Sequence, residues 1–183
     1  MGRRPQPEIK ERLLDACTDH ALARGLPDRL EPLASAAGTS ARMLIYHFGT
    51  RDRLLRAVLE RARQRQLTAF GDLLRVRPGE AYTVTLTSAW TFITGPEGQP
   101  YLRMFGQLRE SAAVQLLPDF RRVATTDWLG PLEEGLLSIG RPELATLVLA
   151  VIRGLLMDLD ATADNARTDR AFAHFVGTLD QPG

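Results

Sequence analysis

The stretch GTSARMLIYHFGTRDRLL, residues 38–55, decides the fold because it places two glycines around one short amphipathic helix. Gly38 is suited to a tight turn, and Ser40 is a favoured N-cap for a helix that runs to about Phe48. A second glycine ends this helix, and Thr50 can cap a longer one directly after it. The stretch therefore predicts a turn, a short helix and a long helix in close succession.

The short helix has two chemically different sides when its residues are spaced at about 100° each. One side carries the apolar side chains that would face a core, namely Ala41, Leu44, Ile45 and Phe48. The opposite side carries Arg42, Met43 and Tyr46, with His47 at its margin. We expect the apolar side to hold the helix in its domain, which leaves the other side available to a partner.

The sequence before this stretch predicts two further helices. The first covers about residues 7–24 and is closed by Gly25, and the second is short and is capped by Asp28 with Glu31 as its partner in a capping box. Three short helices with a glycine turn between the second and the third form a helix-turn-helix arrangement. Helical patterns continue over about residues 80–94, 101–115, 119–138, 142–161 and 166–179, with the Gly130-Pro131 pair expected to kink or split the third of these.

The predicted fold is therefore all-α, with a three-helix DNA-binding domain at residues 1–65 and a larger helical domain at residues 66–183. The charge distribution favours a polyanionic partner for the first part, which holds 13 basic and 8 acidic residues, against 10 and 14 in the rest. An arginine can pair bidentately with guanine, and the helix N-termini can bind phosphate. The predicted DNA contacts are Thr39, Ser40, Arg42, Met43, Tyr46, His47, Thr50 and Arg51, with Arg3 and Arg4 as a basic arm.

Three segments, KERLLDACTDHALARG, LEPLASAAGTS and MLIYHFGTRDRLLRAVLE, together resemble the N-terminal domain of the TetR family of bacterial transcriptional regulators. The match covers about 50 residues and includes an L-x-x-H-F-G-[ST]-[KR] frame between Leu44 and Arg51. The sequence differs from the family at Ile45, where a tyrosine is usual, and at Asp28, where a threonine often caps the second helix. The resemblance implies a homodimeric repressor that binds a palindromic operator and is released by a small molecule, with residues 66–183 as its effector-binding and dimerisation domain.

The C-terminal half contains candidate residues for dimerisation and for effector binding. The run LATLVLAVIRGLLMDL, residues 144–159, is apolar on nearly all sides and predicts a helix buried on more than one face, either in a dimer or within one protomer. The predicted dimer contacts are Leu147, Val151, Gly154, Leu155, Phe172 and Phe175. The predicted walls of an effector pocket are Trp90, Phe92, Tyr101, Met104, Phe105, Arg109, Trp128 and Met157, which could also be plain core.

Other function classes lack support in the sequence. We find no paired carboxylates with a base, no glycine-rich phosphate loop and no Ser/His/Asp frame, so we predict no enzyme and no cofactor. The three histidines and the single cysteine, Cys17, show no metal-ligand spacing, and Cys17 suits a reducing cytoplasm. No run is long and apolar enough to predict a membrane span. The alternative is a helical small-molecule-binding or interaction protein without DNA affinity, and activation stays open beside repression.

Overall fold

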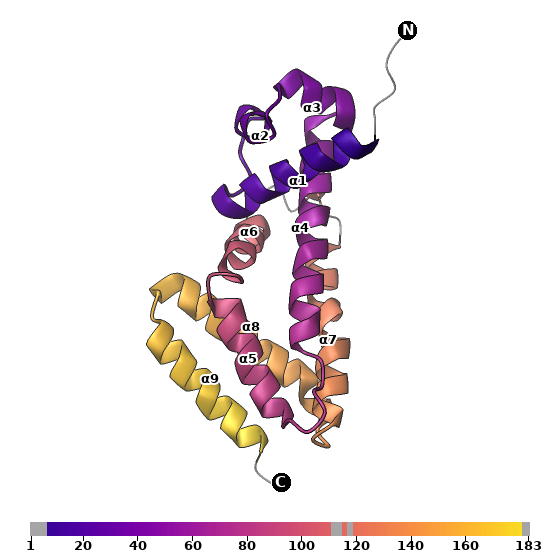
Figure 1. Ribbon diagram of the computed structural model, residues 1–183. Coiled ribbons are helices and arrows are strands. Elements are labelled where there is room, and N and C mark those ends of the chain that lie inside the picture. Colours follow the sequence, from indigo (N-terminus) through magenta and orange to yellow (C-terminus); the bar gives the residue numbers. More distant parts are fainter. Residues whose placement is uncertain (1–6, 111–114, 117–118, 181–183) are drawn as a thin grey trace. The chain divides into compact units, whose positions relative to one another are not determined.

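A computed structural model describes residues 7–110, 115–116 and 119–180, and all longer regular elements in these ranges are α-helices (Figure 1). The N-terminal helices are α1 (Pro7–Arg24), α2 (Glu31–Ala36), α3 (Ala41–Phe48) and α4 (Arg51–Leu73). The others are α5 (Tyr82–Thr94), α6 (Gln99–Glu110), α7 (Phe120–Leu137), α8 (Ala145–Thr162) and α9 (Asn165–Leu179), with a 3₁₀ turn at Pro142–Leu144 before α8. The predicted all-α fold is confirmed.

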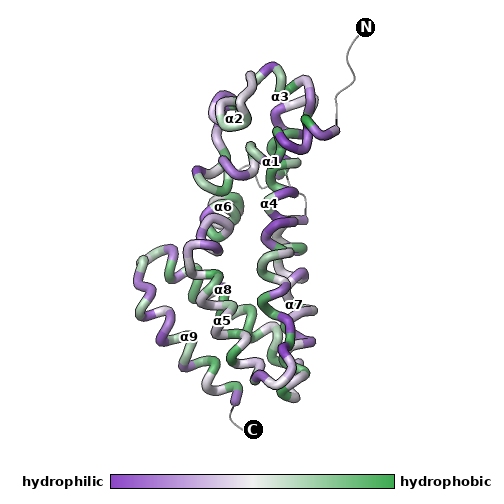
Figure 2. The backbone as a smooth tube through the Cα atoms, viewed as in Figure 1, coloured by the Kyte–Doolittle hydropathy of each residue, from purple (hydrophilic) through white to green (hydrophobic). Residues whose placement is uncertain are grey.

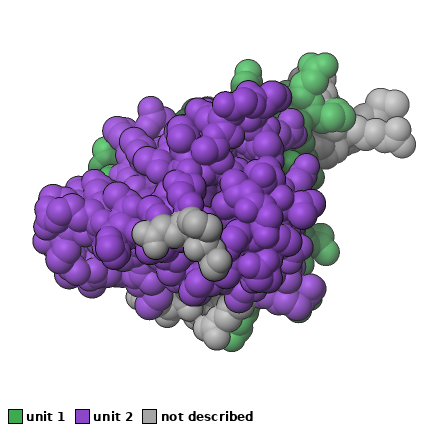
Figure 3. Space-filling view, turned by 90° about the horizontal axis from the view of Figure 1, so that it is seen from below, with its two compact units in different colours: residues 1–66, 99–120 green, residues 67–98, 121–183 purple. Residues whose placement is uncertain are grey.

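The chain forms two compact units, which Figure 3 distinguishes by colour. The first unit comprises residues 1–66 and 99–120, and so contains α1, α2, α3, most of α4, and α6. The second unit comprises residues 67–98 and 121–183, with the end of α4 and helices α5, α7, α8 and α9. The functional division at residue 65 stays a prediction.

The core of the first unit is built where α1, α2 and α3 pack on one another and on α4. Its fully buried side chains include Cys17, Ala21, Leu33, Leu44, Leu54 and Leu59. Apolar residues recur at intervals along each helix and are separated by hydrophilic ones, as Figure 2 shows, which is the pattern of helices that bury one face.

The core of the second unit joins α5, α7, α8 and α9. Its buried side chains include Tyr82, Leu86, Leu132, Leu136, Val148 and Val176. The indole ring of Trp90 on α5 stacks on Phe172 of α9 with 4.6 Å between the ring centroids, and its Nε1 donates a hydrogen bond of 2.7 Å to the carboxylate of Asp169. These contacts fix α9 on α5.

One local prediction was wrong. Leu30, rather than Asp28, is the N-cap residue of α2, because residues 28–30 form a bend and the helix begins only at Glu31 with no side-chain cap. The Gly130-Pro131 pair was expected to kink or split α7; it does not split the helix, since a proline removes one backbone donor and the flanking turns keep theirs, and the kink stays a prediction. Helix α6 covers Gln99–Glu110, against a prediction of about 101–115, of which residues 111–114 lie outside the described residues. Among the described residues, no helix is long and apolar enough to cross a lipid bilayer.

Candidate nucleic-acid interface

Helix α3 is held at both ends by the groups that the sequence indicates. The hydroxyl of Ser40 accepts a hydrogen bond of 3.3 Å from the backbone N–H of Met43, which makes Ser40 the N-cap of α3. The turn before α3 places Gly38 at a φ of +63°, and the turn after it places Gly49 at a φ of +87°. Both values lie in the left-handed region that glycine adopts without strain. The two glycines and the cap thus set the limits of the helix.

The two sides of α3 are divided as its helical phase predicts. Leu44 is 0% exposed and Phe48 is 7% exposed, whereas Met43 is 42% and Tyr46 is 50% exposed. Arg42 is exposed as well. Leu44 and Phe48 therefore anchor α3 in the core, and a polar and aromatic face with Arg42 and Tyr46 one turn apart is left toward solvent.

His47 lies at the margin of this face, as expected. Its ring meets the ring of Tyr46 edge-on with 5.2 Å between the centroids, and it is partly buried. Its Nδ1 atom is shielded from solvent and has no hydrogen-bond partner among the described residues. On the other side of α3, the Lys10 ammonium of α1 lies 5.3 Å from the centre of the Phe48 ring, which adds a cation–π contact between the two helices.

The start of α4 supplies a second group of predicted contacts. Thr50 caps α4, since its hydroxyl accepts a hydrogen bond of 3.2 Å from the backbone N–H of Arg53. Thr50 is exposed, and Thr39 is partly buried in the turn before α3. The Arg51 guanidinium donates to the Pro27 carbonyl at 3.4 Å, an interaction at the surface. The N-terminus of α4 presents backbone donors and a positive dipole end, which favours a phosphate. Arg3 and Arg4 lie outside the described residues.

Arg61 and Arg65 of α4 form ion pairs with α1 and are not free to attract DNA. The Asp15 carboxylate of α1 accepts hydrogen bonds from Arg61 at 2.5 Å and from Arg65 at 2.8 Å. Arg61 also pairs with Glu11, and Arg65 with Asp19 at 2.6 Å. The hydrogen bond to Glu11 raises the pKa of the Arg61 guanidinium. These ion pairs tie α1 to α4 and neutralise arginines that could otherwise attract DNA.

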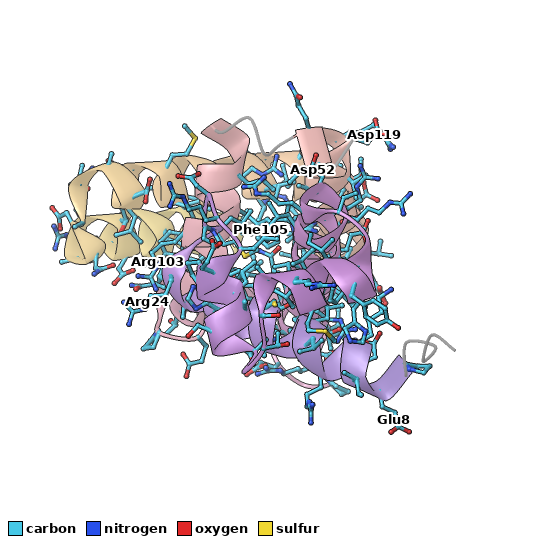
Figure 4. The ribbon with its side chains drawn as sticks, turned by 90° about the horizontal axis from the view of Figure 1, so that it is seen from above. Glu8, Arg24, Asp52, Arg103, Phe105 and Asp119 are labelled. Carbon is cyan, nitrogen blue, oxygen red and sulfur yellow. The ribbon has the colours of Figure 1, made fainter. Side chains whose placement is uncertain are left out.

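Figure 4 shows the side chains from above and labels Phe105, Arg24 and Arg103 among others. Phe105 of α6 is buried, whereas Arg24 at the end of α1 and Arg103 on α6 are exposed. Arg103 forms no ion pair with any described residue. Arg103 therefore serves as a comparison for Arg42: it lies in the same unit but on α6 and not on α3.

The residues predicted to form one effector pocket lie in both units. Tyr101, Met104 and Phe105 belong to α6 of the first unit, and Trp90, Phe92, Trp128 and Met157 belong to the second. Met157 is 67% exposed, and the side chain of Arg109 lies outside the described residues.

Within the second unit, Phe92 of α5 and Trp128 of α7 both contact Phe70 of α4. The distances between ring centroids are 5.7 Å for Phe70 and Phe92 and 6.0 Å for Phe70 and Trp128. Phe70 was not among the residues predicted from the sequence, although it stands four residues after the buried Gln66 on the inner side of α4. We call these three rings the aromatic cluster.

The predicted dimer residues differ in exposure. Leu147 is 49% exposed and Gly154 is exposed, while Val151, Leu155 and Phe175 are partly buried. Phe172 is 1% exposed and stacks on Trp90, so it belongs to the core of the second unit and offers no surface to a partner.

No group of three or more potential metal-ligating side chains is present among the described residues.

Comparison with known proteins places this geometry in a structural class. No protein-family model and no curated protein match the sequence. A transcriptional regulator from Rhodococcus sp. RHA1 matches the structure with a TM-score of 0.71 at 24% identity, covering 93% of this chain and 95% of that one. A Rhodococcus sp. protein assigned to the TetR-family transcriptional regulators matches with a TM-score of 0.61 at 25% identity, covering 96% and 98%.

A third similar structure is the multidrug binding protein EbrR complexed with imidazole. It matches with a TM-score of 0.66 at 20% identity and covers 100% of this chain and 95% of that one. The chain thus has the helical fold of transcriptional regulators with a helix-turn-helix. More particularly, it has the fold of the TetR family, which confirms the resemblance seen in the sequence. Regulators of this family are not enzymes.

Proposed function

We propose that the protein is a ligand-responsive transcriptional regulator that binds a palindromic DNA operator as a homodimer. In this proposal it represses transcription until a small-molecule effector releases it, which places it with its DNA in the bacterial cytoplasm. The observation that carries the proposal is the exposed face of α3, where Arg42 and Tyr46 stand one turn apart on a helix anchored by Leu44 and Phe48. This face would enter the major groove, with Arg42 reading a guanine.

Contacts to phosphates would fix the position of α3 in the groove. Thr39, Ser40 and Thr50 offer hydroxyl groups near the two helix N-termini, and Arg51 adds a positive charge. Such contacts carry little sequence information, but they make the affinity depend on the salt concentration.

A homodimer is supported by an exposed stripe along α8. Leu147, Ala150, Gly154 and Met157 are all exposed, and their spacing of three, four and three residues puts them on one side of the helix. A Cβ atom added at Gly154 would meet nothing within 4 Å in the protomer, so the chain itself does not require glycine there. A second copy packed closely on α8 would require it. Two recognition helices about 34–36 Å apart could then read successive major grooves.

An effector site is supported by the aromatic cluster of Phe70, Phe92 and Trp128. Aromatic side chains commonly line small-molecule sites. The similarity to EbrR, which was crystallised with imidazole, points in the same direction. Helix α4 runs from Arg51 to Leu73 and contributes to both units, so a shift of α4 on effector binding would reach the helix-turn-helix. A coupling of about 1–3 kcal/mol would be enough for a switch.

The direct test is selection of bound sequences from genomic DNA with the purified protein, followed by titration of the selected site at several salt concentrations. We expect a palindromic site and an affinity that falls steeply as salt rises. A helical binding protein without DNA affinity would select no palindrome and would show no such slope. For the effector, an operator affinity that stays unchanged over a broad panel of metabolites would contradict the inducible part of the proposal.

The dimer is tested by sedimentation equilibrium of the wild type and of Gly154→Leu. We expect the wild type to sediment as a dimer and G154L to shift toward the monomer, because a leucine would block the close approach of two α8 helices. Gly130→Leu is the matched control, since Gly130 is also exposed, helical and free of neighbours within 4 Å of an added Cβ. A monomeric wild type, or equal masses for the two variants, would contradict the proposed interface.

A further inference from the structure

We propose that a groove between the C-terminal end of α4 and α7 is a second small-molecule site, selective for an organic cation with an apolar body. The two helices lie side by side (Figure 1), and the groove has a volume of about 340 Å³. It is lined by Leu67, Thr68, Gly71, Asp72, Leu74, Arg75, Val76, Pro131, Glu134 and Gly135. All of them belong to the second unit, and none belongs to the aromatic cluster.

The groove has room for a ligand because Gly71 of α4 lines it and carries no side chain. A Cβ atom added at Gly71 would meet no other atom within 4 Å, so the space beside it is open. Leu67, Leu74 and Pro131 provide apolar walls for the body of a ligand. A volume in this range is at the lower end of that found for small-molecule sites.

The electrostatics of the groove favour a positive charge. Helices carry partial negative charge at their C-termini, and basic residues in the last turn normally offset it. Neither α4 nor α7 has a basic residue in its last turn, and instead Asp72 and Glu134 stand there. An acidic side chain at the negative end of a helix destabilises that helix. Residues that lower local stability in this way are typical of functional sites.

Glu134 is the carboxylate best placed to receive the cation. Asp72 already pairs with Arg75 at 3.3 Å, whereas Glu134 forms no hydrogen bond or ion pair with any described residue. With Asp72 paired, Glu134 leaves the groove with one uncompensated negative charge. A divalent metal is a poorer fit than an organic cation, because no group of three potential ligands is found in the described part of the chain.

Tyr82 does not line the groove itself, but it contacts three residues that do. Its buried hydroxyl donates to the Leu74 carbonyl at 3.1 Å and lies 3.5 Å from the Pro131 carbonyl, and its ring lies against Gly135. Burial, and after it the charge of Glu134, raises the pKa of Tyr82 well above its usual range, so the hydroxyl keeps its proton. Tyr82 therefore joins the residue after α4 to α7 and holds the two sides of the groove together.

The test uses three probes of nearly the same shape on the full-length protein: 2-phenylethylammonium, the neutral 2-phenylethanol and the anionic 3-phenylpropionate. Binding is measured by isothermal titration calorimetry, without DNA, so the result does not depend on the proposed regulatory function. We expect saturable binding of the cation, weaker binding of the alcohol and none of the anion.

Two variants and one control locate the site. Glu134→Gln should weaken binding of the cation about fivefold, as expected for an ion pair at a half-open site. Glu133→Gln removes the same charge from the neighbouring position, which does not line the groove, and should leave the affinity unchanged. Gly71→Leu should fill the groove and abolish binding, and circular dichroism checks that it folds. Absence of saturable binding, equal affinity for cation and alcohol, or equal effects of E134Q and E133Q would overturn the proposal.

Discussion

Replacing Gly135 by alanine adds one Cβ atom and so tests how closely α7 packs on Tyr82 in the second unit. A Cβ atom at this position would lie 1.8 Å from Cζ of Tyr82 and 2.2 Å from its hydroxyl oxygen, far inside van der Waals contact. The ring cannot simply turn away, because it is buried and its hydroxyl donates to the Leu74 carbonyl. The alanine must therefore push α5 from α7 or break that hydrogen bond.

The expected cost follows from three contributions. Overpacking of a filled core costs about 1–3 kcal/mol. Loss of the Tyr82 hydrogen bond costs about 1 kcal/mol. Alanine in place of glycine inside a helix returns about 0.5–1 kcal/mol. We expect Gly135→Ala to lower the free energy of unfolding by about 1–3 kcal/mol in total.

Gly71→Ala is the matched control, because an added Cβ meets nothing there and only the gain in helix propensity remains. We expect this variant to be as stable as the wild type or more stable by up to about 1 kcal/mol. Urea unfolding at one fixed protein concentration measures both values. The double variant Y82L/G135A should lose less than the sum of its single changes, since leucine removes the ring that clashes. Equal stability of G135A and G71A would refute the packing described for Tyr82.

Three further predictions concern the first unit. Asp15→Asn removes one negative charge that Arg61 and Arg65 share, so the free energy of unfolding should fall by about 1–2 kcal/mol at low salt and by less at high salt. A loss of stability that does not change with salt in urea unfolding would contradict the role of these ion pairs. Ser40→Ala removes the N-cap of α3 and should cost about 1 kcal/mol by the same measurement, and an unchanged midpoint would contradict the cap. Burial raises the pKa of the Cys17 thiol to about 11, so a thiol reagent at mildly alkaline pH should label it slowly in the folded protein and rapidly in urea, whereas rapid labelling of the folded protein would show an accessible thiol.

Local sequence patterns predicted the candidate DNA-binding face well. The period of α3 fixed which side chains are buried, and the caps and glycine turns fixed where the helix begins and ends. These features depend on neighbours within a few residues of each other, so one sequence is enough to predict them. The prediction for Asp28 was wrong because a cap needs a particular backbone conformation, which the bend at residues 28–30 does not provide.

Features that join distant parts of the chain were not predictable in the same way. The ion pairs between Arg61 and Asp15 and between Arg65 and Asp19 span 46 residues each, and a row of arginines on a helix gives no sign of them. The sequence of an apolar helix likewise does not indicate which neighbouring helix covers it. Phe172 was therefore predicted to be an interface residue, although Trp90 covers it within the protomer.

The most direct test of the central claim compares Arg42→Ala with Arg103→Ala on the operator that the wild type selects. Both arginines are exposed and lie in the first unit, and both changes remove one positive charge, but only Arg42 stands on the open face of α3. Fluorescence anisotropy titrations at fixed salt should show a loss of about 1–3 kcal/mol per half-site for R42A, with relaxed preference at one base pair, and little loss for R103A. Equal affinities of the two variants for the operator, or an R42A protein with wild-type affinity, would contradict DNA recognition by α3.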